Sequence, residues 1–150
     1  SEIVKKFLSW FMANKVAVLS LEKKFKKFDG KIKKTALKIF EILKKKNVSV
    51  EVYLAGNQKM RFLNKKFRRK DKSTDVLSFE EPKGFIYPKS KFKPIGEVYI
   101  NVSSVKCQMS SLLIHGLLHL FNYNHKKKND RIKMEKKEKY VYNSFRYRNK

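Results

Sequence analysis

All three histidines of this 150-residue chain lie in one run, HGLLHLFNYNH, from His115 to His125. On a helix, His115 and His119 would share one face about one turn apart, close enough for both imidazoles to bind one cation. His125 can join them only if the helix ends first, and Asn122 tolerates the left-handed conformation that ends helices. Three imidazoles with a fourth position left for water are typical of catalytic zinc. The alternative is two core histidines and one on the surface.

The residue after the first histidine indicates what such a site would not do. Metalloproteases carry H-E-x-x-H, in which the Glu is the general base. Gly116 occupies that position here, so peptide cleavage would lack its usual base. Phosphodiester chemistry instead needs a cation and positive side chains that stabilise an anionic transition state. Arg68 and Arg69 fit that need, and a hydrolase of small or peptide substrates is disfavoured.

The charge of the chain points to a polyanionic partner. It has 38 Lys plus Arg against 13 Asp plus Glu, a formal net charge of +25 at pH 7. Such self-repulsion costs folding stability, and nucleic acid is the commonest compensating partner. The alternative explanation for the charge is a generally lysine-rich proteome. The candidate RNA contacts are Arg69, Lys126, Lys127 and Lys128, the lysine-rich residues 23–46, and the aromatic and basic end from Tyr140 to Arg148.

The cysteine content and the apolar segments bear on the compartment. Cys107 is the single cysteine and cannot form an internal disulfide, which indicates a reducing compartment and a cytoplasmic location. We interpret it as a buried packing residue. The apolar stretch from Phe7 to Ala13 is far shorter than the roughly 20 residues that span a membrane, so no membrane partner is expected.

Hydrophobic periodicity predicts the elements that would position these residues. Helices are expected at residues 3–13 and 31–46, from an N-cap at Asn57 through Phe67, from a cap at Ser103 or Ser104 through Phe121, and at residues 129–145. Strands are expected at residues 48–54, 75–79 and 96–101, and residues 82–94, which hold all three prolines, are expected to form a loop. The histidine helix is apolar nearly all round and must therefore be central. We expect one domain over residues 1–150, with the first 30 residues a less certain extension.

Two blocks of the sequence resemble a known family. The histidine run is similar to H-G-x-L-H-L-x-G-Y-D-H, the signature of the YbeY family of bacterial ribosomal RNA maturation factors. A second block, LNKKFRRKDKSTDVLSF at residues 63–79, resembles that family's L-N-x-x-Y-R-x-x-D-x-x-T-D-V-L-S-F, and GEV at residues 96–98 resembles its G-D-I. The blocks follow the family's order, and the resemblance covers about residues 48–138.

This resemblance implies an activity and a fold. The activity is that of a single-strand-specific, metal-dependent endoribonuclease in 3′-end maturation of small-subunit (16S-type) ribosomal RNA and in ribosome quality control. The fold is α+β, a small mixed β-sheet packed with helices, with a core similar to that of zinc metalloproteases. The implied partners are ribosomal RNA and the small ribosomal subunit with its assembly proteins.

The resemblance also assigns roles to residues. His115, His119 and His125 match the ligands of one Zn²⁺ ion per chain, although three imidazoles also accept Ni²⁺, Co²⁺ or Cu²⁺. Arg68 matches the family's functionally required arginine, and His115 matches the histidine most often treated as essential. Both are therefore candidate catalytic residues.

Two residues depart from the signature. Asn122 replaces Gly, which is mild because Asn adopts the same turn. Asn124 replaces Asp and keeps hydrogen bonding but loses a charge that could hold an imidazole or accept a proton. Asp75 and Ser78 are expected beside the site, where they would orient substrate or serve the strand. Because no strong general base stands near the histidines, a non-catalytic, RNA-binding ribosome-assembly factor with a structural metal is the alternative function.

Overall fold

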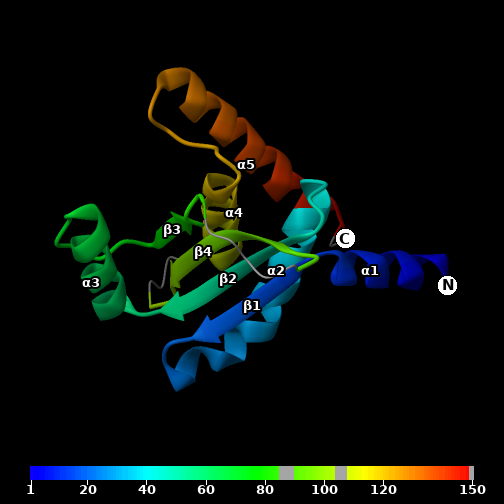
Figure 1. Ribbon diagram of the computed structural model, residues 1–150, viewed down its shortest axis with the longest axis horizontal. Coiled ribbons are helices and arrows are strands. Elements are labelled where there is room, and N and C mark those ends of the chain that lie inside the picture. The colour runs from blue at the N-terminus through cyan, green and yellow to red at the C-terminus, as the bar shows by residue number, and fades with distance from the viewer. Residues whose placement is uncertain (85–89, 104–107, 149–150) are drawn as a thin grey trace.

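Four strands form one mixed sheet at the centre of the molecule (Figure 1). The structure is a computed structural model and describes residues 1–84, 90–103 and 108–148. The strands are β1 (Lys15–Ser20), β2 (Val48–Ala55), β3 (Val76–Glu80) and β4 (Lys93–Asn101), and their order in the sheet is β1-β2-β4-β3. β1 and β4 both run parallel to β2, whereas β3 is antiparallel to β4. The predicted fold class, α+β with a small mixed sheet, is confirmed.

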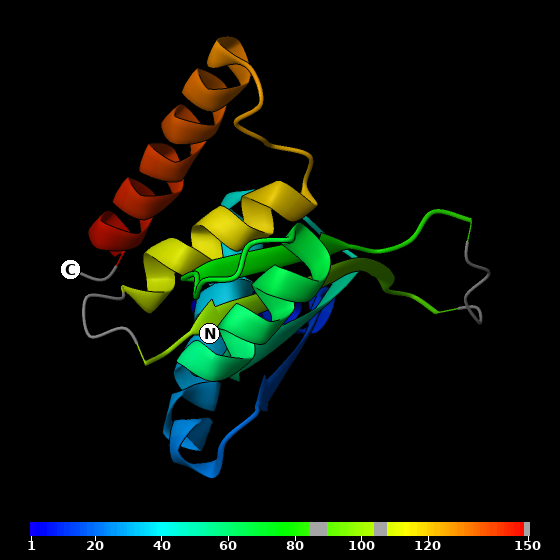
Figure 2. The ribbon, with the colours of Figure 1, turned by 90° about the vertical axis from the view of Figure 1, so that its left-hand side faces the viewer.

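Helices cover the two faces of the sheet unequally. They are α1 (Glu2–Ala13), the 3-10 helix η1 (Lys23–Phe28), α2 (Asp29–Ile42), α3 (Asn57–Arg68), α4 (Met109–Leu120) and α5 (Lys128–Arg148). α2 and α4 pack on one face, and α4 lies between the sheet and α5 (Figure 2). α3 packs against one end of the other face. The histidine helix, α4, is therefore enclosed on two sides.

The main core lies between the sheet and α2, α4 and α5. Alternate residues of β2 and β4 point into it, and Val52, Leu54 and Val98 are fully buried there. α5 contributes Met134 and Val141, which are also fully buried. The prediction that the apolar helix is central is confirmed, and the burial of its apolar side chains fixes the positions of His115 and His119.

β1 is the strand that the sequence analysis missed, and the short helix η1 was not predicted either. β1 lies at the edge of the sheet within the first 30 residues and pairs with β2 from Lys15 to Ser20. Among the residues of β1, only Val16 is buried. Ala17 and Leu19, on the face opposite Val16 and Val18, are apolar as well, so apolar and polar residues do not alternate along the strand.

Both predicted helix caps differ from those observed. Gly56, not Asn57, is the N-cap of α3, because the Asn57 amide oxygen accepts a hydrogen bond from the Asn101 side chain at 2.7 Å. α4 begins at Met109 after an N-cap at Gln108, so Ser103 does not cap it. Ser104 and Cys107 lie outside the described residues.

Three further boundaries shift by three residues or more. The helix predicted at residues 31–46 runs from 29 to 42, because Lys44 turns the chain with a left-handed φ of 55°. The helix predicted at residues 129–145 extends to 128–148. β4 starts at residue 93 rather than 96. Pro94 pairs with Ser49 and Gly96 pairs with Val50, so one residue of β4 bulges between them and interrupts the alternation that the sequence analysis used.

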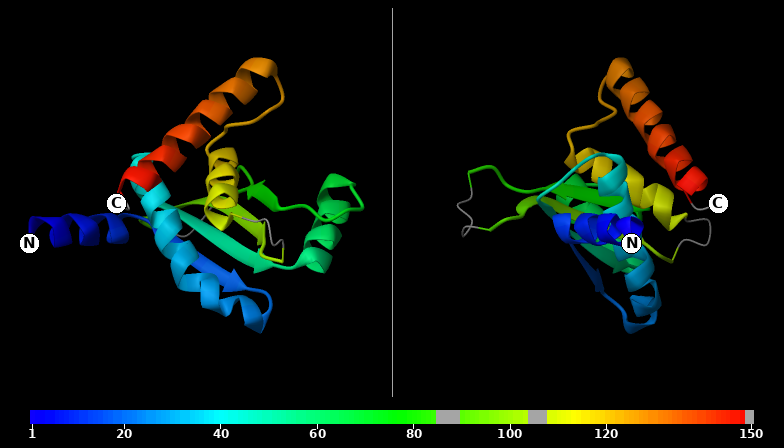
Figure 3. Two further views of the ribbon diagram at one scale, coloured as in Figure 1. Left: turned by 180° about the vertical axis from the view of Figure 1, so that it is seen from behind. Right: turned by 90° about the vertical axis from the view of Figure 1, so that its right-hand side faces the viewer.

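α1 extends away from the body of the molecule (Figure 3). It exposes Ile3, Val4 and Leu8, and the side chains of Phe7, Trp10 and Phe11 lie outside the description. Among the described residues, no helix combines the length and apolar character needed to cross a membrane.

Candidate metal centre

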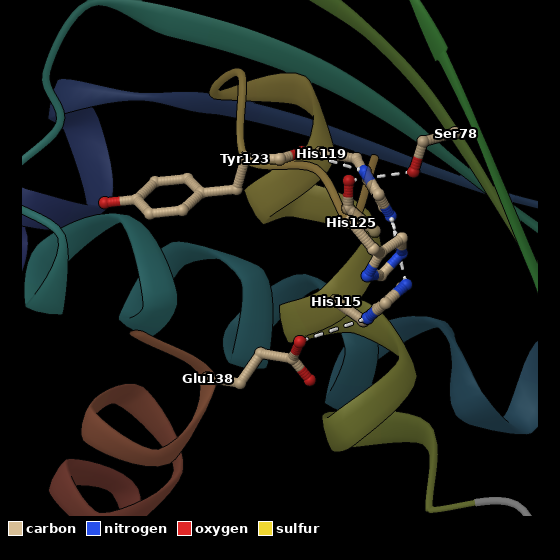
Figure 4. A network of polar contacts seen from close by, with 7 residues as sticks. Ser78, His115, His119, Tyr123, His125 and Glu138 are labelled. Atoms are coloured by element: carbon tan, nitrogen blue, oxygen red, sulfur yellow. Dashed lines mark hydrogen bonds and ion pairs between the residues drawn. The ribbon is translucent and has the colours of Figure 1, made fainter. Parts of the chain in front are cut away.

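The three histidine rings converge on one point (Figure 4). The Nε2 atom of His119 lies 3.0 Å from the Nε2 atoms of both His115 and His125. His115 and His119 come from successive turns of α4, and His125 follows the end of that helix. The arrangement predicted from the H-x3-H-x5-H spacing is therefore observed.

A turn at the end of α4 brings His125 back toward the other two rings. Asn122 adopts the left-handed conformation with φ of 71°. The backbone N–H of Tyr123 donates to Leu118 O at 3.1 Å, and that of Asn122 donates to His119 O at 3.1 Å. These two bonds form a Schellman motif, the commonest way for a helix to end at a left-handed residue. The turn predicted at Asn122 is confirmed.

The protons of two rings are directed away from the point of convergence. His119 Nδ1 lies 2.9 Å from the carbonyl oxygen of Tyr123, which can only accept a hydrogen bond. His115 Nδ1 lies 3.3 Å from a carboxylate oxygen of Glu138. With Nδ1 as donor, the Nε2 atom of each neutral ring carries a lone pair. The lone pairs therefore face one another across the centre.

This donor set fits a cation. Lone pairs at 3.0 Å repel unless a positive charge lies among them. Burial, and then the neighbouring His115 and His125, lower the pKa of His119 to about 4, so this ring is neutral near pH 7. Neutral imidazoles whose other nitrogen donates to a carbonyl or carboxylate are the usual metal ligands. Three imidazoles without a thiolate, two of them oriented in this way, suit Zn²⁺ and leave one position open.

The centre opens into a groove of about 1080 Å³. Its far wall comes from the end of α3 and from β3, and its near wall from the turn after α4. The lining residues include the three histidines, Phe67, Arg68, Phe79, Glu80, Asn124 and Lys126. Arg68 and the candidate metal ligands thus line the same groove, as a phosphate-binding site requires.

Ser78 joins the arginine to the histidine helix. Its hydroxyl donates to the Gly116 carbonyl oxygen at 2.8 Å, and its own carbonyl oxygen accepts from Arg68 Nη2 at 2.9 Å. The Arg68 guanidinium also lies over the Phe79 ring, 5.6 Å from its centroid. β3 therefore sets the position of Arg68 relative to the imidazoles.

Gly116 allows α4 to approach the sheet closely. A Cβ atom at this position would lie 2.6 Å from Cγ1 of Val98 and 3.2 Å from the Ser78 hydroxyl. The metalloprotease glutamate could not occupy this position without separating the helix from β4. The absence of that base, noted in the sequence, therefore has a packing reason.

Comparisons with known proteins identify the family. A family model described as endoribonuclease YbeY matches residues 13–146. The chain belongs to the YbeY family. A relative named endoribonuclease YbeY from Aquifex aeolicus is 34% identical over 125 residues, which are 76% of this chain and 79% of the relative. Another relative of that name, from Pelagibacter ubique, is 35% identical over 131 residues, which are 80% of this chain and 84% of the relative.

A solved structure supports the fold. The solution structure of TM1509 from Thermotoga maritima superposes with a TM-score of 0.51 and 28% sequence identity. The match covers 89% of this chain and 93% of TM1509. The predicted membership of the YbeY family and the prediction of an enzyme are confirmed, and the fold is consistent with the zincin-like core expected of that family.

Of the other predicted site residues, some line the groove beside the histidines and others do not. Lys126 lines the groove, whereas Lys127, Lys128 and Arg69 do not. Arg69 instead ends α3 in the left-handed conformation. Asp75 is exposed beside β3, and its carbonyl oxygen accepts from the Asn101 N–H at 2.8 Å. The side chains of residues 146–148 lie outside the description.

Asn124 lines the groove but holds no imidazole. Its side-chain oxygen accepts from the backbone N–H of Lys126 at 3.0 Å, which shapes the loop on both sides of His125. The acceptors that orient the other two rings are the Tyr123 carbonyl and Glu138. Loss of the family's Asp at this position therefore leaves these two orienting contacts in place.

Glu138 is the site residue that sequence reasoning missed. It lies on α5, 23 residues after the histidine that it contacts. A signal was present, because Met134, Glu138 and Val141 follow one another at spacings of four and three and so share one helix face. A carboxylate within a buried apolar stripe indicates a polar partner across the interface.

Proposed function

We propose that this chain is a metal-dependent endoribonuclease that cuts single-stranded ribosomal RNA, with a role in 3′-end maturation of small-subunit RNA and in ribosome quality control. The observation that carries the proposal is the set of three converging imidazoles beside Arg68 in one open groove. The relatives are named endoribonucleases, which supports the reaction class. The proposal includes one Zn²⁺ ion per chain, a cytoplasmic location, and the small ribosomal subunit with its assembly proteins as partners.

The chain's own residues would divide the work. His115, His119 and His125 would hold the Zn²⁺ ion, which when bound supplies a Lewis acid for a phosphate oxygen or for the nucleophile. The Arg68 guanidinium, anchored on the Ser78 carbonyl oxygen, would neutralise negative charge that develops on the phosphate. Its anchoring matters because a preorganised cation needs no reorganisation during the reaction. Lys126 would add positive charge at the opposite wall of the groove.

The second candidate is a non-catalytic RNA-binding assembly factor. Asn124 is the observation that favours it, because the signature's only carboxylate beside the third histidine is replaced by a neutral amide. Glu80 is the one carboxylate among the described groove-lining residues.

Metal removal and restoration tests the proposal. Purified chain is treated with a chelator and then titrated with Zn²⁺ while cleavage of matched single-stranded and double-stranded RNA is followed. We expect cleavage of the single strand alone, lost on chelation and restored at about one ion per chain. Zinc-loaded chain that binds the single strand but leaves it intact would favour the assembly factor.

A further inference from the structure

Exposed aromatic and basic side chains follow one another along and around α3. Phe62 and Phe67 are each 55% exposed. The ammonium group of Lys59 lies 5.1 Å from the Phe62 ring centroid, and that of Lys66 lies 5.9 Å from Phe62 and 5.4 Å from Phe67. We call Lys59, Phe62, Lys66 and Phe67 the α3 stripe.

Other side chains of α3 contact the rest of the protein. Met60 and Leu63 are buried against the sheet. Arg61 and Lys65 bind Asp71, with nitrogen-to-oxygen distances of 2.8 Å and 3.9 Å. Within the described parts of the chain, the ammonium groups of the α3 stripe have no carboxylate partner. Among the described residues, no acidic side chain thus neutralises the two lysines of the stripe.

The α3 stripe is continuous with the groove. The Phe67 ring meets the Phe79 ring edge-on, with centroids 5.2 Å apart, and both rings line the groove beside Arg68. From Lys59 to Phe67 the helix rises about 12 Å. A strand whose phosphate lies at Arg68 could therefore continue onto the stripe without crossing a buried element.

We propose that the α3 stripe binds the single-stranded RNA that extends out of the groove, with one base stacked on Phe67 and another on Phe62. Lys66 would bind the phosphate between these two bases, and Lys59 the phosphate beyond Phe62. Exposed rings flanked by free cations suit unpaired nucleotides, since base stacking is sequence-tolerant and the backbone is anionic. A duplex could not use the rings, because its bases already stack on one another. This inference rests on the proposed function, which places an RNA strand in the groove.

The test is binding of a fluorescent 12-nucleotide oligouridine whose 2′-hydroxyls are methylated, followed by anisotropy with zinc-loaded chain. We expect Phe62→Ala to weaken binding at least about 5-fold, because one stacking contact is lost, and Phe62→Tyr to retain it. Lys66→Ala should lower the slope of log affinity against log salt by about one. Phe92→Ala is the matched control, since Phe92 lies directly before β4 outside the groove lining, with the Lys91 ammonium 5.7 Å from its ring centroid, and should bind normally.

Three results would overturn the proposal that the α3 stripe binds RNA: wild-type affinity in Phe62→Ala, an equal loss in Phe92→Ala, or no binding of the oligonucleotide by the wild type. The first of these, in a chain that still cleaves RNA, would leave the nuclease proposal intact and would direct attention to a protein partner for the rings. RNA binding that depends on Phe62, in a chain that never cleaves RNA, would support RNA binding by the α3 stripe and contradict the proposal of a nuclease.

Discussion

Two hydrogen bonds orient the candidate metal ligands at the level of single residues. The Tyr123 carbonyl and the Glu138 carboxylate contact Nδ1 of His119 and His115, so both Nε2 lone pairs face the centre. A ligand oriented in this way loses less entropy on binding a metal than a freely rotating ring. The geometry therefore gives α5, through Glu138, a part in orienting a candidate metal ligand.

Glu138→Gln tests that part. An amide is a weaker acceptor than a carboxylate, so we expect zinc affinity to fall about 10- to 100-fold, measured by competition with a chelator of known affinity. Glu135→Gln, an exposed change on the same helix, is the control and should bind zinc like the wild type. An unchanged affinity in Glu138→Gln would show that the contact does not orient His115.

The Schellman turn at Asn122 makes a second prediction. Alanine lacks the local hydrogen bonding that helps Asn adopt a positive φ, so Asn122→Ala should lower the free energy of unfolding by about 1 kcal/mol. It should also weaken zinc binding, because His125 follows the turn. Asn122→Gly should keep both properties. Denaturant unfolding of metal-free chain and zinc competition measure the two effects, and a wild-type-like Asn122→Ala would refute this account of the turn.

At the level of elements, the sequence predicted what periodicity encodes and little else. The histidine helix, β2 and the turn at Asn122 were all predictable, because each depends on local pattern or on one residue's conformational preference. β1 was not, since its apolar residues lie on both faces of the strand and leave little alternation. Glu138 and the role of Ser78 depend on contacts between elements far apart in the chain, and a single sequence does not encode those directly.

The open face of the sheet carries a carboxylate pair beside two stacked tyrosines. The rings of Tyr53 and Tyr99 lie 4.5 Å apart, and their hydroxyls donate to Glu51 and Glu97. Burial, and then the nearby Glu51, raise the pKa of Glu97, and burial raises that of Tyr99 to about 12. The anionic form of Glu97 is therefore less favourable in the folded protein than in the unfolded chain.

The sign of the resulting pH dependence follows from that shift. Because the folded pKa of Glu97 is raised, its contribution to stability is fully present below the unfolded value of about 4.5 and is lost as the pH rises through the folded pKa. We expect Glu97→Gln to unfold at higher denaturant concentration than the wild type at pH 7, with the difference shrinking at pH 4. Glu135→Gln serves again as the exposed control. A difference that grows toward low pH would contradict the assignment.

For the whole molecule, the charge of +25 predicts strongly salt-dependent RNA binding. Reversing Lys126, Lys127 and Lys128 to Glu should weaken binding of single-stranded ribosomal RNA and flatten its dependence on salt. Lys126 lines the groove whereas the other two do not, so Lys126→Glu alone should cause the largest single loss. Filter binding across a series of salt concentrations measures both effects. Equal affinity and equal slope in the triple variant would exclude this end of the groove as an RNA contact.

The most direct test of the central claim separates metal binding from cleavage. Wild-type chain, His115→Ala and Arg68→Ala are each assayed for cleavage of a single-stranded precursor fragment of small-subunit ribosomal RNA, with bound metal measured in the same samples. The account predicts that wild type cuts, that His115→Ala loses both metal and cleavage, and that Arg68→Ala keeps its metal but loses cleavage. Equal behaviour of all three proteins, whether inert or equally active, would contradict it.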